Sequence, residues 1–228
     1  MKQLLGLVLV CGFATGAFAQ VIWDNGAANA GGVASQRDTI YLGIGFNAQS
    51  ADDFVLPTGP GGEPQWSITG VTWSGVYFGA GAVQDEFNLI LYADDGTGNA
   101  PTGAGLNDPT PTALFAPRVS FASVNETATA LGFDYSHTLA SPWTVDANTK
   151  YWFVAQSDMN FPPQWAFAPS VSSQLHVNVR GWPLLGTPYW TDLAGGDAAF
   201  TLVGVPVPEP ATIGLLTIGG LAMLRRRR

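Results

Sequence analysis

The chain has 228 residues, of which 11% are charged and 46% are hydrophobic, with 28 glycines and 16 prolines. This composition excludes an intrinsically disordered chain, because such chains carry more charge and fewer apolar residues. Without the two terminal segments described below, four basic residues face sixteen acidic ones, a net charge of −12. A surface this acidic repels phosphate groups, which excludes nucleic acids and anionic lipid headgroups as partners.

The N-terminus has the three parts of a secretory signal peptide. Lys2 supplies the positive charge, Leu4–Phe13 is an apolar run, and Ala17 and Ala19 occupy the positions that a signal peptidase reads. The apolar run is too short to cross a bilayer as a permanent helix. We therefore predict a signal peptide over residues 1–19, an exported protein, and cleavage after Ala19.

Cys11 lies inside the apolar run of this signal peptide. It follows Val10 rather than a small residue, so we interpret it as a filler of the run and not as a lipidation site. The mature protein then has no cysteine and forms no disulfide, although it is exported to an oxidising compartment. Its stability must come from a hydrophobic core, from bound ions, or from both.

Seven segments between residues 20 and 205 have the pattern of β-strands. Apolar and polar residues alternate in them with a period of two, and clusters of turn residues separate them. Outside the two terminal segments, no stretch has the 3.6-residue period of an amphipathic helix. We therefore predict one all-β domain over residues 20–205, an antiparallel two-sheet sandwich of jelly-roll type. The predicted strands are Ser50–Leu56, Trp66–Phe78, Glu86–Ala93, Thr127–Leu139, Lys150–Gln156, Gln174–Arg180 and Asp197–Val203.

The loop after the third predicted strand gathers groups that suit a hard cation. Asp94, Asp95 and Asn99 place two carboxylates and an amide oxygen within six residues. Ca²⁺ takes several oxygen ligands, so these three residues are a candidate calcium site. The spacing lacks the last acidic residue of an EF-hand loop, and Asp-Gly and Gly-Asn are ordinary turn sequences, so a plain turn remains the alternative. Asp52 and Asp53 are a second, weaker candidate of the same kind.

The tryptophans fall into two groups. Trp73 and Trp152 lie within predicted strands, where we expect them to be part of the core. Trp165, Trp182 and Trp190 each lie near prolines or loop residues. Loop aromatics at one end of a sandwich can stack on sugar rings, and they can equally pin a loop to the core. These three residues are therefore candidate glycan-stacking residues, with the structural role as the alternative.

Motifs of catalysis are missing from the sequence. It contains no Gly-x-Ser-x-Gly elbow, no His-Glu-x-x-His sequence and no cysteine outside the signal peptide. His137 and His176 lie in predicted strands, where a histidine is more often a structural sheet residue than a general base. No spacing singles out a carboxylate pair for glycoside hydrolysis. We expect no catalytic residues.

The C-terminus combines a rigid Pro208-Glu209-Pro210 segment, an apolar stretch over Ala211–Leu224 and four terminal arginines. The fourteen residues of the apolar stretch would form a helix of about 21 Å, shorter than the ~30 Å hydrocarbon core of a bilayer. The arginines are expected to stay on the cytoplasmic side by the positive-inside rule. This segment is therefore expected to hold the chain in the membrane transiently.

In this order, the three C-terminal elements resemble the PEP-CTERM sorting signal, over residues 206–228. The resemblance implies recognition of Pro208, Glu209 and Pro210 by an exosortase-type membrane enzyme. It also implies removal of the tail and transit through the inner membrane to the cell surface or an extracellular polysaccharide matrix.

Two functions of the domain over residues 20–205 stay open. One is a non-catalytic surface or matrix protein that binds glycans. The other is a secreted carbohydrate-active enzyme on a jelly-roll scaffold. Two carboxylates about 5 to 9 Å apart beside exposed tryptophans would favour the enzyme.

Overall fold

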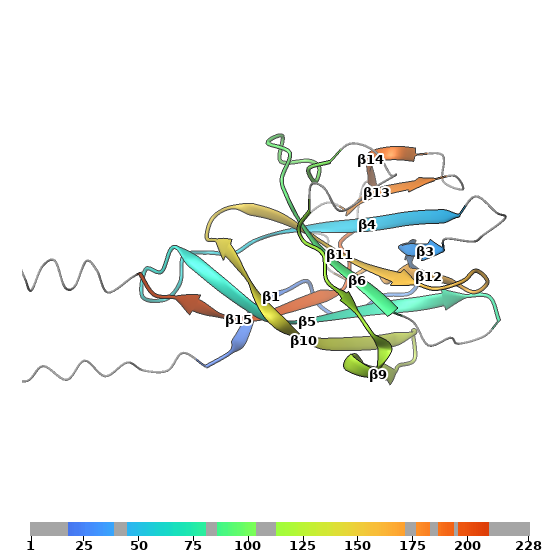
Figure 1. The fold of residues 1–228 in the computed structure, drawn as a ribbon, viewed down its shortest axis with the longest axis horizontal. Coiled ribbons are helices and arrows are strands. Elements are labelled where there is room, and N and C mark those ends of the chain that lie inside the picture. Colours follow the sequence, from blue (N-terminus) through green and yellow to red (C-terminus); the bar gives the residue numbers. More distant parts are fainter. Residues whose placement is uncertain are drawn as a thin grey trace, which may run out of the picture.

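The computed structural model describes residues 18–38, 45–80, 86–103, 113–171, 177–182, 187–193 and 196–209, and for residues 177–182, 187 and 188 it describes the backbone. The described residues form fifteen strands and one short 3-10 helix, η2 (Phe121–Ser123). The strands make two sheets that pack face to face (Figure 1). The predicted all-β, two-sheet architecture is therefore confirmed, whereas its jelly-roll type stays a prediction.

One sheet has seven strands and is antiparallel throughout. β5 lies at its centre, with β15 and then β1 on one side and β10 and then β9 on the other. β12, which also pairs with β2, continues along the β15 side of β5. The strands are β1 (Gln20–Asp24), β2 (Val33–Ala34), β5 (Gln65–Phe78), β9 (Asn125–Ala128), β10 (Phe133–Asp146), β12 (Gln164–Phe167) and β15 (Phe200–Val207).

The other sheet has eight strands, in the order β14-β13-β4-β3-β11-β6-β7, with β8 also pairing with β6. β4 and β11 pair with each other as well, and β3 runs parallel to β11 over two residues. The remaining pairings of this sheet are antiparallel. The strands are β3 (Gln36–Asp38), β4 (Phe46–Val55), β6 (Glu86–Ala93), β7 (Ala113–Phe115), β8 (Arg118–Val119), β11 (Lys150–Asp158), β13 (Val177–Trp182) and β14 (Thr187–Leu193).

The hydrophobic core lies between the sheets and is rich in aromatic rings. Trp73 of β5 stacks on Tyr135 of β10, with ring centroids 5.5 Å apart, and meets Phe87 of β6 edge-on at 5.1 Å. Trp73 and Trp152 are both buried, as predicted. Each fully buried side chain of this size contributes about 1.5–3 kcal/mol or more to folding by leaving water.

The eight-stranded sheet is buried on both faces, as the alternation along β6 illustrates. Phe87, Leu89 and Leu91 belong to the core between the sheets, whereas Ile90 and Tyr92 belong to a second cluster on the outer face. Ala51 of β4 and Trp152 and Val154 of β11 complete that second cluster, and Trp190 of β14 packs against it. The outer face of the seven-stranded sheet, in contrast, carries polar side chains.

Three strand predictions need correction or lie partly outside the described residues. The predicted strand Thr127–Leu139 is two strands, β9 and β10, which pair through a hairpin. Gly132 ends that hairpin against β5, where a Cβ atom would lie 2.3 Å from the carbonyl oxygen of Gly75. The last strand extends to Val207, two residues past the predicted domain end. Residues 174–176 of the sixth predicted strand lie outside the described residues.

Candidate functional site

The two carboxylates predicted as calcium ligands close the loop after β6 on itself. One oxygen of Asp94 accepts hydrogen bonds from the backbone N–H groups of Gly96 and Gly98, each at 2.9 Å. One oxygen of Asp95 accepts hydrogen bonds from the N–H and the hydroxyl of Thr97, at 2.8 and 2.6 Å. Aspartates commonly stabilise turns in this way, so these contacts match the plain turn that the sequence left as the alternative.

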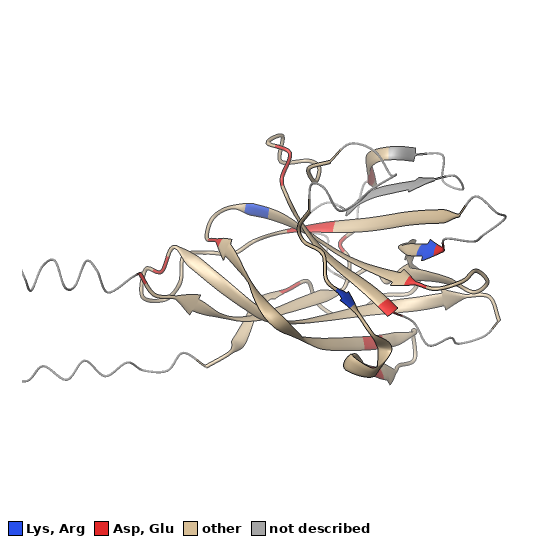
Figure 2. Ribbon diagram, viewed as in Figure 1, with Lys and Arg blue, Asp and Glu red and all other residues tan. Residues whose placement is uncertain are grey.

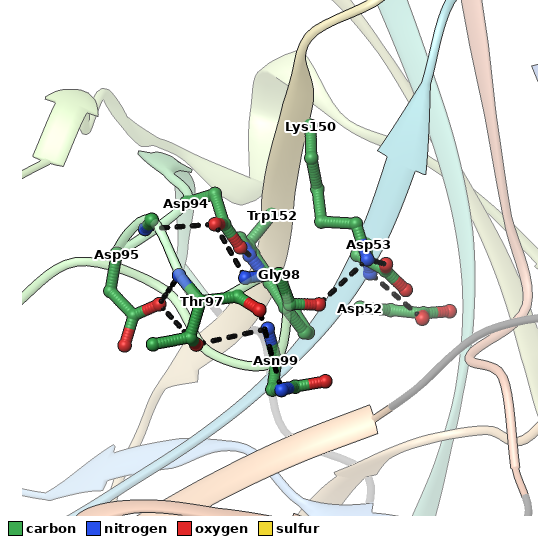
Figure 3. A network of polar contacts seen from close by, with 10 residues as sticks. Asp52, Asp53, Asp94, Asp95, Thr97, Gly98, Asn99, Lys150 and Trp152 are labelled. Carbon is green, nitrogen blue, oxygen red and sulfur yellow. Dashed lines mark hydrogen bonds and ion pairs between the residues drawn. The ribbon is translucent and has the colours of Figure 1, made fainter.

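A lysine ammonium supplies the positive charge beside this loop (Figure 3). Lys150 at the start of β11 donates a hydrogen bond to the carbonyl oxygen of Gly98 at 2.8 Å and forms an ion pair with the buried Asp53. Its ammonium lies 5.6 Å from the ring centroid of Trp152, whose indole N–H donates to Asp94 at 3.0 Å. These contacts pin the loop to the outer face of the eight-stranded sheet.

Asn99, the third predicted calcium ligand, contacts the same turn: its side-chain amide donates to the carbonyl oxygen of Thr97 at 3.4 Å. Among the residues that the structure describes, no group of three or more His, Cys, Asp or Glu side chains is placed to hold a metal ion. Calcium binding by Asp94, Asp95 and Asn99 stays a prediction, and the geometry favours the structural role of the loop.

Asp52 and Asp53 point to opposite faces of β4 and do not share a site. Asp53 pairs with Lys150 on the outer face, whereas Asp52 is buried towards the other sheet. The carboxylate of Asp52 accepts hydrogen bonds from the side-chain amide of Asn25 at 2.7 Å and from the backbone N–H of Ala198 at 2.6 Å. Burial raises the pKa of Asp52 well above its ordinary value.

Trp165 is a core residue, so its prediction as a glycan-stacking residue is wrong. It lies on β12, and its side chain is fully buried. The indole ring covers Gly75 of β5, where a Cβ atom would lie 2.3 Å from the ring. Its N–H points to the hydroxyl of Tyr135 at 3.4 Å. The neighbouring prolines suggested a loop, but the pairing of β12 with β5 turns this ring inwards.

The other two candidate tryptophans lie on the β13–β14 hairpin at the edge of the eight-stranded sheet. Trp182 is the last residue of β13, and its side chain lies outside the described ones. Trp190 on β14 is half-buried and meets Tyr92 edge-on, with ring centroids 5.7 Å apart. Its neighbour Tyr189 is 66% exposed and offers the more open ring. Glycan stacking at Trp182 and Trp190 stays a prediction.

A site that the sequence did not indicate lies on the outer face of the seven-stranded sheet. It is an open pocket of about 640 Å³, and we call it the polar pocket. A row of five polar residues crosses it, one from each of β9, β10, β5, β15 and β1. Each member of the row is the direct register partner of the next: Asn125, Ser136, Thr72, Thr201 and Asp24.

A second row runs beside the first and lines the same pocket. Thr127 of β9 pairs with Asp134 of β10, and Asp134 pairs with Ser74 of β5. Because side chains two positions apart in a strand point to the same face, both rows face solvent together. The exposed Leu131 in the β9–β10 hairpin adds an apolar residue to the pocket.

The polar pocket carries no positive charge. The residues described as lining it include no Lys, Arg or His. The seven strands of its sheet contain no Lys or Arg at all. Figure 2 shows the described basic residues on the other sheet, at β3, β8 and the start of β11. A site of this kind cannot attract an anionic ligand, but its hydroxyl, amide and carboxylate groups suit a neutral polar one.

Two carboxylates line the polar pocket, and each contacts its neighbours. Asp134 accepts a hydrogen bond from the hydroxyl of Ser74 at 2.6 Å. Asp24 accepts one from the N–H of Gly26 at 2.8 Å and one from the hydroxyl of Thr201 at 3.3 Å. The strands that carry them, β1 and β10, are separated by β15 and β5. Three strand spacings separate the backbones of these two strands by roughly 14 Å, and Asp134 lies two residues further along, in the second row.

His137 of β10, one of the two histidines weighed above, takes a structural position. Its ring nitrogen Nδ1 lies 2.8 Å from the carbonyl oxygen of Ser123 in η2. It therefore links the sheet to this 3-10 helix. His176 lies outside the described residues.

The residues of the two processing signals lie partly within the structure. Ala19 is exposed directly before β1, and Pro208 and Glu209 are exposed directly after β15. Pro210, Ala17 and the predicted apolar stretch lie outside the described residues. Within the part of the chain that the structure describes, no helix is long and apolar enough to cross a membrane.

The chain is thus a two-sheet all-β domain whose last strand leads directly into a short C-terminal segment. Residues 206–228 match the family model of the PEP-CTERM protein-sorting motif, which confirms the resemblance of the tail. The motif marks an exported protein that an exosortase, a membrane enzyme, sorts to the cell surface. Neither the curated proteins nor the solved structures gave a match to the chain.

Proposed function

We propose that this protein is retained at the cell surface or in the polysaccharide matrix around it, and that its domain binds neutral glycans there without catalysis. The observation that carries the proposal is the polar pocket, in which five strands contribute one continuous row of polar side chains. The two-sheet domain, which we interpret as a jelly-roll scaffold, holds this row rigidly.

The chemistry of the row suits the hydroxyl groups of a sugar chain. Each sugar hydroxyl donates one hydrogen bond and accepts others, and the serine and threonine hydroxyls of the pocket do the same. Neighbouring strands are spaced about 4.8 Å apart, so the row offers a polar group at intervals comparable to the length of one sugar residue. The lack of Lys and Arg in this sheet favours a neutral glycan over a sulfated or uronic acid chain.

The carboxylates of the pocket support a binding role over hydrolysis. Glycosidases place their two catalytic carboxyl groups about 5 to 9.5 Å apart. Asp24 and Asp134 lie on strands three positions apart, whose backbones are roughly 14 Å from each other. Each is also engaged by a hydroxyl of the sheet. The alternative of a carbohydrate-active enzyme therefore finds no support in this pocket.

The proposal is tested by affinity electrophoresis of the secreted domain in gels that contain neutral or anionic polysaccharides. Retardation is expected in neutral gels. The double variant Thr72→Ala/Ser136→Ala removes two central hydroxyls of the row. Each hydrogen bond contributes about 0.5–1.5 kcal/mol, so we expect roughly tenfold weaker binding.

The matched control is Ser67→Ala/Thr144→Ala, a directly paired serine and threonine of the same two strands that line neither the polar pocket nor the hollow beside it. This control should bind like the unaltered protein. If both double variants bind equally well, or if anionic polysaccharides alone retard the protein, the proposed site is wrong.

A further inference from the structure

The two halves of β15 are held to the sheet unequally. Its residues from Thr201 to Gly204 pair with β5 on one side and with β1 on the other. The pairing with β1 ends where Gln20 meets Gly204. Residues 205–207 are therefore paired on the β5 side alone within the described strands.

A break in register separates these two halves. The pairing of β15 with β5 shifts between Val203 and Gly204. Gly204 approaches β5 so closely that a Cβ atom would lie 2.6 Å from the carbonyl oxygen of Ser67. Thr69 of β5 is the extra residue of this bulge, opposite Val203 and Gly204, and it interrupts the ladder between the two strands. Past the bulge, Pro206 lies where β15 is paired on one side alone, as is usual for a proline in an edge strand.

The terminal segment is nevertheless part of the folded sheet. Pro206 pairs with Trp66, and Val207 pairs with Gln65. Residues 205–207 are half-buried, whereas Pro208 and Glu209, which follow at once, are exposed. The sorting motif thus begins without any spacer after the last paired residue of the domain.

An enzyme that recognises a peptide motif needs space around the neighbouring residues. The end of β15, while it is paired within the folded domain, leaves little of that space. We propose that residues 205–207 are a detachable end of β15, which must unpair from β5 before the membrane enzyme can bind Pro208 and Glu209. Unpairing three residues frees about 10 Å of extended chain. The bulge at Gly204 confines the opening, so the rest of β15 stays paired on both sides.

The proposal is tested by locking the end of β15 in the full-length chain, expressed in its own cells. Gln65→Cys together with Val207→Cys places two cysteines at directly paired positions, a separation that suits a disulfide. No other cysteine remains after the signal peptide. If the membrane enzyme cannot bind the closed form, the rate of processing is limited by the fraction of molecules in which the end of β15 is open. The disulfide lowers this fraction, so we expect the tail-bearing precursor to be processed at least about tenfold more slowly.

Two controls make the result decisive. Ser67→Cys/Thr144→Cys staples β5 to β10 instead and should be processed at the normal rate. A Gly-Ser-Gly-Ser insertion between Val207 and Pro208 should restore processing of the stapled variant, because the motif then has its own spacer. Normal processing of the stapled chain would overturn the proposal, and so would a block that the spacer does not relieve.

Discussion

Lys150 is the cation that balances Asp53, a carboxylate with no solvent exposure. Lys150→Met keeps the length and apolar body of the side chain but removes the ammonium from this buried ion pair. Removing one partner of a buried pair typically costs 3–5 kcal/mol, and we expect about 3 kcal/mol here because Lys150 is partly exposed. Urea unfolding of the secreted domain measures this loss.

The matched control at the residue scale is Arg118→Met. Arg118 pairs with Glu86 at the surface, where both side chains are well exposed, and also with Asp158, which keeps a second cation in Arg37. Exposed pairs contribute less than about 1 kcal/mol, so this variant should unfold almost like the unaltered domain. Equal losses in the two variants would mean that the Lys150–Asp53 pair does not hold the loop and β4 as described.

At the scale of elements, Asp52 connects the two sheets. From β4 of one sheet, its carboxylate binds the N–H of Ala198 at the entry to β15 and the amide of Asn25 after β1. Asn25 in turn accepts a hydrogen bond from the hydroxyl of Ser170 on its carbonyl oxygen. A single buried carboxyl group therefore joins β4 to both strands at one edge of the seven-stranded sheet.

This connection makes stability depend on pH. Burial raises the pKa of Asp52 in the native state, with a further rise from Asp197 and Asp53. The native protein thus binds the proton more tightly than the unfolded chain. The resulting stabilisation is complete below the unfolded pKa of about 3.9 and is lost as the pH rises through the raised native pKa.

Asp52→Asn cannot ionise, so it should remove this dependence. In urea unfolding at a series of pH values, the unaltered domain should lose stability relative to Asp52→Asn as the pH rises, by up to about 1.4 kcal/mol per pH unit. A constant difference between the unaltered domain and Asp52→Asn would refute the assignment.

The sequence predicts the strands that can be recognised from their own residues alone. Both β6 and β11 are dense in apolar and aromatic residues, and both strands were placed to within two residues. β2, β3, β7 and β8 have two or three residues each, which is too short for any period to show. β12 was missed because Pro162 and Pro163 directly before it suggested a loop, and this error led to the wrong prediction for Trp165.

The polar pocket could not be predicted from the sequence, because its residues lie far apart in the chain and form no local pattern. Its first row joins residues 24, 72, 125, 136 and 201, which become neighbours only through the register of five strands. Each serine or threonine, taken alone, is an ordinary solvent-facing residue of an alternating strand. The pairing of Lys150 with Asp53 depends in the same way on the contact of β11 with β4.

At the scale of the whole molecule, export, sorting and binding use different parts of one sheet. β1 begins and β15 ends at the same end of the domain, since Gln20 pairs with Gly204 (Figure 1). Thr201, in the row of the polar pocket, lies six residues before Val207, about 20 Å along the strand. The sorting segment and the proposed glycan-binding pocket therefore lie on separate parts of the seven-stranded sheet.

The most direct test of glycan binding at the polar pocket is an NMR titration of the isotope-labelled domain with soluble neutral oligosaccharides. The account predicts that the amide signals that shift belong to the rows of the pocket, above all Thr72, Ser136 and Thr201. Shifts concentrated instead around Tyr189 and Trp190 on β14, or no shifts with any neutral oligosaccharide, would contradict it.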